Sequence, residues 1–399
     1  MQGFSMKRFL LSSFVMLYSL YAFSYDGIVE KKEFRLDSYK TVAGVTIKNV
    51  RIGYESYGKL NEDKSNVILV AHYFSGSSHA AGKYAANDEL PGYWDSIIGP
   101  GKALDTNKYF VISSDTLVNV SPKDPKTITT GPASINEVTG KAYGMDFPLV
   151  GVRDFVQIQR KLLDSLGIKK LHAVAGPSAG GAQAIEWAAA YPDDVSRVVA
   201  VVPPGVSLPP YVISLLNSWS MPIKLDPKWN QGKYTPGNEP HEGLVESLKL
   251  ITLSSTHHGW AKGYGNGPAE KGQNPLKSYS NKFAVEKALQ ERGELRAKYA
   301  DPNSILYMAR AMQSFNIEKD MKKIKADVLF IPAEKDFIFP AEISMEAAKI
   351  LCGLGKRAEV HVLKGDGGHL DGLTKIADAT DTIKAFLERP KGAGNPCLH

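Results

Sequence analysis

A serine flanked by glycines, Ser178 in the segment Gly176–Gly180, is the residue of this sequence with the clearest chemistry. The segment reads G-x-S-x-G, follows the apolar run Leu171–Ala175 and precedes an alanine-rich segment that ends before Pro192. A strand, a sharp turn and a helix in that order are typical of a nucleophile elbow, which lifts a serine hydroxyl above a sheet. We therefore predict that Ser178 is a nucleophile; the alternative is a glycine-rich turn with a capping serine.

A serine nucleophile needs a base, and the base needs an acid that orients it. Behind such an elbow these residues follow in the order Ser, Asp or Glu, His. Asp336 comes after the apolar run 326–331, and His369 comes after the run 359–363 in a glycine-rich segment. We predict His369 as general base and acid and Asp336 as the orienting acid. Glu334 is an alternative acid, because it lies only two residues away.

Two backbone amides should complete the site by stabilising the oxyanion of an acyl-transfer intermediate. One belongs to the residue after the nucleophile, which is Ala179, and the other to a loop after an early strand. That loop follows the run Asn66–Ala71, and Phe74 is the expected donor. Because no His, Cys or carboxylate cluster has metal-ligand spacing, we predict no metal. We also expect no cofactor.

Short apolar runs bounded by turn residues predict the strands that position these groups. Such runs are typical of strands buried on both faces of a parallel sheet. Between them lie helical patterns, such as the 3.6-residue apolar stripe of Asp154–Leu166. The alternation predicts an α/β fold with a mostly parallel, doubly wound sheet. The predicted strands are 66–71, 109–113, 171–175, 195–202, 326–331 and 359–363.

One region interrupts the alternation of strands and helices. Residues 204–303 carry several Pro and Gly pairs and only short helical patches. We predict a mainly helical cap inserted into a discontinuous core of residues 25–203 and 304–390, with a C-terminal tail at 391–399. Insertions of this length in compact domains are usually lids or binding loops.

The first 24 residues are expected to be a cleaved secretory signal peptide. Lys7 and Arg8 precede the apolar stretch Phe9–Tyr21, and small residues stand at the cleavage positions before Tyr25. The apolar stretch reaches about 20 Å, which is too short for a membrane core of about 30 Å. We therefore predict an exported protein, periplasmic or secreted, with no stable membrane insertion after cleavage.

The composition excludes several classes of protein. The 399 residues are 43% hydrophobic and 23% charged, which is typical of a globular protein and not of a coiled coil or a disordered chain. The formal charge of +6 is spread along the chain without a basic run, so we predict no nucleic-acid partner. Cys352 and Cys397 could form a disulfide in an oxidising compartment, and the sequence leaves open whether they are close enough.

Further motifs resemble the homoserine O-acetyltransferase branch of the α/β-hydrolase superfamily. They lie in 71–82, 92–106, 131–154 and 226–234, so the resemblance covers most of residues 50–380. It implies an α/β-hydrolase fold, an acyl-enzyme on Ser178 and transfer of an acyl group from acyl-CoA to an amino-acid hydroxyl. It also implies a homodimer formed through the cap. Tyr234, in the last of these motifs, and Asp371 are expected to contact the substrate.

The chain departs from this family at two charged positions. Members that use homoserine have an Arg six residues before the cap residue Asp226, whereas this chain has Ser220 with Lys224 nearby. A Lys does not replace the bidentate contacts of an Arg. Leu370, and not an Asp, follows His369. Two charge partners of an amino-acid substrate are therefore missing or displaced.

These departures and the predicted export favour hydrolysis of a small-molecule ester or acyl substrate as the main activity. Water is the abundant acceptor outside the inner membrane, and only the second nucleophile distinguishes hydrolysis from transfer. The alternative is an acyltransferase that moves an acyl group from acyl-CoA to a hydroxyl acceptor. A non-catalytic binding protein is the second alternative, because fold does not determine function.

Overall fold

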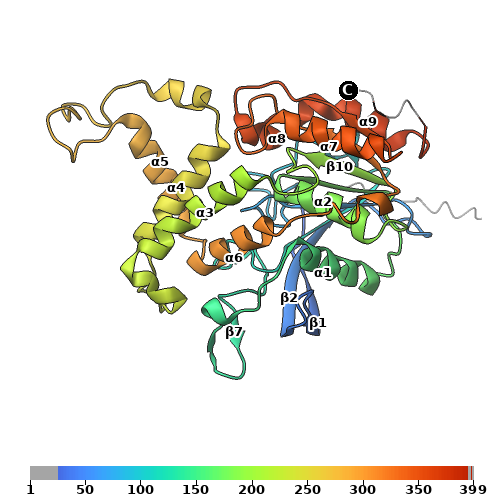
Figure 1. Ribbon diagram of the computed structural model, residues 1–399, viewed down its shortest axis with the longest axis horizontal. Coiled ribbons are helices and arrows are strands. Elements are labelled where there is room, and N and C mark those ends of the chain that lie inside the picture. The colour runs from blue at the N-terminus through green and yellow to red at the C-terminus, as the bar shows by residue number, and fades with distance from the viewer. Residues whose placement is uncertain (1–25, 394–396, 398–399) are drawn as a thin grey trace, which may run out of the picture.

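The computed structural model describes residues 26–393 and 397, so the predicted signal peptide lies outside the described residues. Its centre is an eight-stranded sheet (Figure 1). The strand order is β1-β2-β6-β3-β9-β10-β11-β12, and pairing is parallel from β6 to β12. The predicted α/β class with a mostly parallel sheet is confirmed. The strands are β1 (Lys32–Lys40), β2 (Thr46–Tyr57), β3 (Val67–Ala71), β6 (Phe110–Ser114), β9 (Ala173–Pro177), β10 (Arg197–Val201), β11 (Asp327–Ile331) and β12 (Ala358–Val360).

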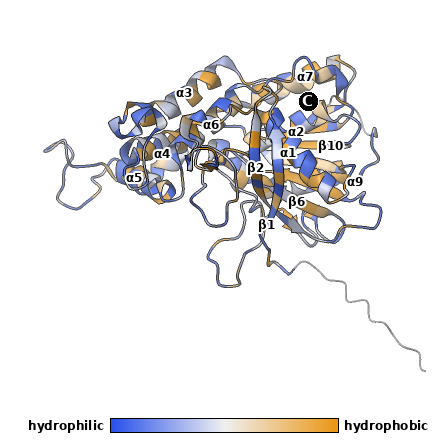
Figure 2. Cartoon of the chain, turned by 90° about the horizontal axis from the view of Figure 1, so that it is seen from below, coloured by the Kyte–Doolittle hydropathy of each residue, from blue (hydrophilic) through white to orange (hydrophobic). Residues whose placement is uncertain are grey.

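The antiparallel hairpin of β1 and β2 lacks the apolar runs that reveal the other strands. β1 reads KEFRLDSYK and has one buried residue, Tyr39, because most of it faces solvent. By contrast, β3, β9, β10 and β11 are buried along their whole length. Figure 2 shows β6 and β10 largely in the hydrophobic colour, while β1 is mixed. Two small two-stranded sheets, β4 (Ile98–Gly99) with β5 (Leu104–Asp105) and β7 (Ile135–Asn136) with β8 (Lys141–Ala142), lie outside the main sheet.

Helices cover both faces of the main sheet. Alternate residues of β3 point to opposite sides, since Leu69 belongs to one hydrophobic cluster and Ile68 to another. The first cluster includes residues of three core helices, and the second includes Phe386 of α9. Of the helices in the described part of the chain, none is long and apolar enough to cross a bilayer. The core helices are α1 (Val152–Ser165), α2 (Ala179–Ala190) and α7 (Ala341–Gly353) on the first face, α9 (Thr380–Glu388) on the second, and the short α8 (Asp371–Thr374) after His369.

Four helices follow β10 and precede β11 in the chain, and they form a layer beside the core (Figure 1). Buried side chains of this layer, among them Trp219 and Ile251, belong to the same hydrophobic cluster as β3 and β9, so the layer is packed onto the core. The region predicted as the cap, 204–303, contains the first three helices and ends at the start of the fourth. These helices are α3 (Pro210–Leu225), α4 (His241–Ser255), α5 (Ala284–Ala297) and α6 (Pro302–Gln313).

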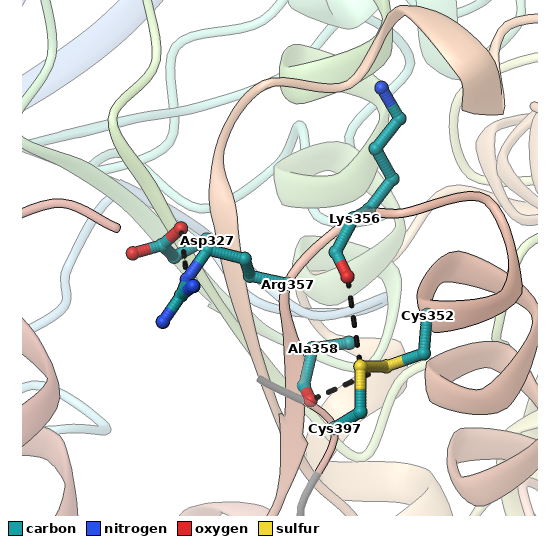
Figure 3. Close-up of a disulfide and its surroundings, with 6 residues drawn as sticks. All are labelled: Asp327, Cys352, Lys356, Arg357, Ala358 and Cys397. Carbon is teal, nitrogen blue, oxygen red and sulfur yellow. Dashed lines mark hydrogen bonds and ion pairs between the residues drawn. A yellow bond between two sulfur atoms is a disulfide. The ribbon is translucent and has the colours of Figure 1, made fainter. Parts of the chain in front are cut away.

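Cys352, on α7, and Cys397 form a disulfide with their Cα atoms 5.8 Å apart (Figure 3). The backbone amide of Cys397 also donates a hydrogen bond to the carbonyl of Ala358 on β12. Nearby, Arg357 and Asp327 form an ion pair that joins β11 to the residue before β12. The disulfide therefore links the end of the chain to the last helix–strand unit of the sheet.

Candidate active site

The backbone of Ser178 has the sharp conformation that an elbow requires. Ser178 joins the end of β9 to the start of α2 with φ 56° and ψ −116°. A non-glycine residue at positive φ is strained and is tolerated where the surrounding structure enforces it. Here the enforcement is close packing, because a Cβ on Gly176 or Gly180 would collide with the carbonyl oxygen of Ala71 at the end of β3. Glycine at both positions lets α2 approach β3 and raises Ser178 at the carboxyl end of the sheet.

His369 lies between Ser178 and Asp336 and is hydrogen-bonded to both. Its Nε2 is 2.8 Å from Ser178 Oγ, and its Nδ1 is 2.6 Å from Asp336 Oδ2. The other carboxylate oxygen of Asp336 accepts hydrogen bonds from the amides of Ile338 and Phe339, at 2.8 and 3.0 Å. Because a carboxylate can only accept a hydrogen bond, Nδ1 carries the proton and donates to Asp336, and Nε2 is left free to accept the serine proton.

The structure thus brings together the three residues that the sequence placed in separate segments. Ser178 follows β9, Asp336 follows β11, and His369 lies beyond β12. Parallel strands end at the same edge of a sheet, which is why residues so far apart in sequence meet there. Glu334, the alternative acid, has an exposed side chain and does not contact His369.

The two predicted amide donors, Phe74 and Ala179, line the same cavity as Ser178. Neither amide has a hydrogen-bond acceptor in the described part of the chain, so both can donate to a ligand. The loop of Phe74 is held in place by Asn119, whose side-chain amide donates to the carbonyl of Gly76 at 2.9 Å. The oxyanion role of these two amides stays a prediction that this geometry permits.

The cavity above Ser178 has a volume of about 310 Å³ and a mostly apolar lining. Its walls come from the cap on one side and from the loops after β11 and β12 on the other. Such a lining favours contact with the apolar part of an acyl group. Among the lining side chains are Val212, Leu216, Trp219, Ile251, Phe339 and Leu370. Among the described residues, no group of three or more His, Cys, Asp or Glu side chains is arranged to hold a metal.

Tyr234, predicted as a substrate contact, does not line this cavity. Its hydroxyl donates to the carboxylate of Asp301 and accepts a bond of 3.2 Å from the amide of Asn303. Asp301 in turn caps α6 through the amide of Ser304. The tyrosine therefore secures the junction between the cap and α6, and its contact with substrate stays a prediction.

Asp371 does not line the cavity either. Its carboxylate accepts a bond of 3.0 Å from the amide of Gly367 and packs against Gly365, and burial raises the pKa of the Asp371 carboxyl. It therefore shapes the turn that carries His369, and its contact with substrate stays a prediction. Leu370 takes the position at the cavity.

The sequence provided no signal for the charged groups of the cavity, Arg292 and Arg296 on α5. α5 lies in a region where no periodic apolar pattern predicted a helix, so neither residue could be assigned to a face. The family position for an Arg, Ser220, is buried and donates to the carbonyl of Leu216 in its own helix. Neither Ser220 nor Lys224 lines the cavity.

Comparison with known proteins agrees with this fold. The family model described as alpha/beta hydrolase fold matches residues 90–375. The homoserine O-acetyltransferase of Deferribacter desulfuricans is 37% identical over 91% of this chain and 96% of its own length. Among solved structures, esterase E22 is 46% identical over 90% of this chain and all of its own, with a TM-score of 0.87. The homoserine O-acetyltransferase of Bacillus anthracis is 38% identical over 92% of this chain and all of its own, also with a TM-score of 0.87.

A parallel sheet with a serine elbow and a cap defines an α/β hydrolase. Within that class, the chain belongs to the homoserine O-acetyltransferase-like family. An esterase and an acetyltransferase superpose on it equally well, so the fold does not separate the two activities.

The expectation of hydrolysis as the main activity is contradicted by the curated relatives. Five curated relatives that match nine-tenths of the chain or more, among them proteins of Geobacter sulfurreducens and Geotalea uraniireducens, are homoserine O-acetyltransferases at 34–37% identity. They favour the acyltransferase alternative. The physical reason for the error is that an absent Arg and Asp at two positions say nothing about other residues that can bind the acceptor.

Proposed function

We propose that this protein transfers an acyl group from an acyl-CoA donor to the hydroxyl of a homoserine-like acceptor, through an acyl-enzyme on Ser178. The observation that carries the proposal is the hydrogen-bonded chain from Ser178 through His369 to Asp336 at the cavity. The curated homoserine O-acetyltransferases that match nine-tenths of the chain support acyl transfer as its chemistry.

In the first half of the reaction, Ser178 Oγ attacks the thioester carbonyl while His369 Nε2 accepts the serine proton. The tetrahedral intermediate places its oxyanion toward the amides of Phe74 and Ala179, and loss of one such donor typically costs about 3 kcal/mol of barrier. The C–S bond then breaks, and His369 gives the proton to the leaving thiolate. Asp336 stays ionised throughout and stabilises the imidazolium.

In the second half, the acceptor hydroxyl attacks the acyl-ester of Ser178. His369 Nε2 takes the hydroxyl proton, the intermediate collapses, and the proton returns to Ser178 Oγ. Water could perform the same attack, so transfer depends on keeping water from the ester. The apolar cap residues around the cavity, such as Leu216 and Trp219, support this requirement.

The test is to incubate the full chain with acetyl-CoA, with and without L-homoserine, and to measure free CoA and O-acetylhomoserine. We expect CoA release to depend on homoserine and to match the amount of ester formed. The Ser178→Ala variant should form no ester. Equal CoA release with and without acceptor, or ester formation by the Ser178→Ala variant, would overturn the proposal.

We propose separately that the chain is exported and that its first 24 residues are removed. The disulfide between Cys352 and Cys397 supports this, because disulfides persist mainly in oxidising compartments. Cell fractionation with mass spectrometry should find a mature chain beginning at Tyr25. A full-length chain with both thiols reduced in the cytoplasm would contradict it. An exported enzyme would need its thioester donor in the same compartment, so this experiment also constrains the donor.

We propose further that two copies associate through the cap, as the family resemblance implies. The cap helices α3 and α4 expose large apolar side chains, with Tyr211 61%, Leu225 72% and Leu253 52% accessible. Light scattering should give twice the mass of the chain, and Leu225→Asp should lower it. A wild-type monomer at micromolar concentration would contradict this.

A further inference from the structure

Arg296 is held at the cavity by three neutral partners. One guanidinium nitrogen, Nη1, donates to Thr252 Oγ1 at 2.9 Å and to the carbonyl of Leu248 at 3.3 Å, both on α4. The other, Nη2, donates to Ser75 Oγ at 3.1 Å. The guanidinium is therefore fixed between a cap helix and the loop of the core that carries Phe74.

The positive charge of Arg296 has no negative partner in the described part of the chain. No Asp or Glu oxygen there lies within 4 Å of its guanidinium nitrogens. Burial lowers the pKa of Arg296, and the nearby Tyr73 hydroxyl offsets this only in part, yet a guanidinium stays protonated in proteins. The Arg296 side chain is half-buried, and a charge partly removed from water is normally paired, because leaving water without a counter-ion is costly.

The guanidinium also has donors to spare. Of the five N–H groups of an arginine, the three recorded bonds leave two without an acceptor among the described residues: Nε–H and one on Nη2. A carboxylate accepts two parallel bonds from such a fork. Both Arg296 and Ser178 line the cavity, so a carboxylate bound to one can belong to a molecule that reacts at the other.

The rest of the cavity adds to this positive character. Arg292, one helical turn before Arg296, also lines it, with its guanidinium over the ring of Trp260 at 4.7 Å. It forms no ion pair with a described Asp or Glu. The remaining lining is mostly apolar or hydroxylic, so a substrate carboxylate would find its charge partner on α5 and not at Ser220 on α3.

We propose that Arg296 is the carboxylate-binding residue of this cavity, and that one of the two substrates carries a carboxylate. The inference rests on the proposed function, because it names a group on the molecules that are joined. The carboxylate has two sources with the same chemistry: the α-carboxylate of an amino-acid acceptor, or the free end of a dicarboxylic acyl group. The site is built differently from the family pattern, since the arginine comes from α5.

Kinetics with paired substrates test this binding role. L-homoserine is compared with L-homoserinamide as acceptor, and succinyl-CoA with butyryl-CoA as donor, in the wild type and in Arg296→Met and Arg296→Lys. We expect Arg296→Met to raise KM about 100-fold for whichever member carries the recognised carboxylate, with kcat little changed, and to leave its neutral partner unaffected. Arg296→Lys should recover part of the loss. Arg310→Met, an exposed arginine on α6, is the matched control.

The paired design separates binding from structural support. If Arg296 only braced the cap, its loss would affect the carboxylate and the neutral substrate equally, and that result would overturn the proposal. The pair that responds identifies the source of the carboxylate: the acceptor pair for an amino acid, the donor pair for a dicarboxylic acyl group.

A second measurement does not depend on acyl transfer. A fluorophosphonate probe labels Ser178, and homoserine, homoserinamide, succinate and succinamide are compared as protecting ligands. We expect a carboxylate to protect the wild type at a concentration at least ten times lower than its amide, and this advantage to disappear in Arg296→Met. Equal protection by the acid and the amide in the wild type would refute the inference. So would an advantage of the carboxylate that is retained in Arg296→Met. If Arg296→Met loses the advantage of the carboxylate over its amide, but the wild type shows no acyl transfer, only the proposed function is refuted.

Discussion

Substituting Asp336 by Asn tests the proposed catalytic chain without changing its shape. Backbone amides of Ile338 and Phe339 donate to Asp336 Oδ1, so in the variant the carbonyl oxygen of Asn must take that position. The NH₂ group then faces His369 Nδ1, which now lies 2.6 Å from Oδ2. Since NH₂ can only donate, Nδ1 must become an acceptor and the proton must move to Nε2.

A histidine protonated on Nε2 cannot accept the proton of Ser178. In a serine protease, where the corresponding Asp→Asn substitution leaves the geometry intact, kcat falls about 10⁴-fold. We expect a similar loss here, which corresponds to about 5.4 kcal/mol of transition-state stabilisation at 1.36 kcal/mol for each factor of ten. The melting temperature should change little, because size and the two backbone hydrogen bonds are kept.

The assay is the rate at which a fluorophosphonate labels Ser178, together with kcat/KM for acyl transfer. Glu334→Gln is the matched control, because Glu334 is exposed and only two residues away, and it should stay within twofold of the wild type. An Asp336→Asn variant within tenfold of the wild type would refute the reasoning, as would a loss in Glu334→Gln equal to that in Asp336→Asn.

Three further predictions concern stability. Gly180→Ala should lower the free energy of unfolding by several kcal/mol in urea, because its Cβ would collide with the carbonyl of Ala71. The control is Gly353→Ala on α7, which has open space around it and should cost no stability. Equal effects of the two substitutions would contradict this prediction. Cys397→Ser should lower unfolding free energy by about 4 kcal/mol, from the 45-residue separation of the disulfide, and an unchanged melting temperature would exclude a bonded pair. Burial alone would raise the pKa of Glu55, but His79 and Lys31 outweigh it and hold that pKa below its usual 4.5. Since the native pKa is the lower one, the stabilisation is present above the unfolded value and is lost as the pH falls through the native value. As the pH is lowered, the free energy of unfolding should therefore fall more steeply in the wild type than in Glu55→Gln. Parallel curves of unfolding free energy against pH would disprove the pairing of Glu55 with His79 and Lys31.

The local sequence pattern was sufficient to predict the strands that are buried on both faces of the sheet. The run before Gly176 and the glycines around Ser178 predict an elbow because strand, turn and helix each leave a distinct signal there. The same holds for the ends of β11 and β12, which is why Asp336 and His369 could be chosen before the structure was known. The antiparallel β1 has no such run, since it is largely exposed and rich in charge.

Contacts between distant segments could not be read in the same way. The family resemblance implies Tyr234 and Asp371 as substrate contacts, but the sequence does not reveal their hydrogen-bond partners, Asp301 and Gly367, which give them structural roles. Arg296 became visible only when α4, α5 and the early loop were seen together around one cavity. The preference for hydrolysis failed for a related reason: it counted charges missing at expected positions, while a cation from another helix lines the cavity.

The insertion of the cap between β10 and β11 determines when this site can exist during biogenesis. These two strands pair in register, with Val199 opposite Leu329, yet the whole cap separates them in the chain. Ser178 precedes the cap in the chain and His369 follows it. During synthesis, Ser178 therefore has no general base until the last strands have emerged. Long-range pairing of this kind is slow because a large loop must close first. Acquisition of activity therefore reports that the segment from β11 onward, which carries Asp336 and His369, has docked.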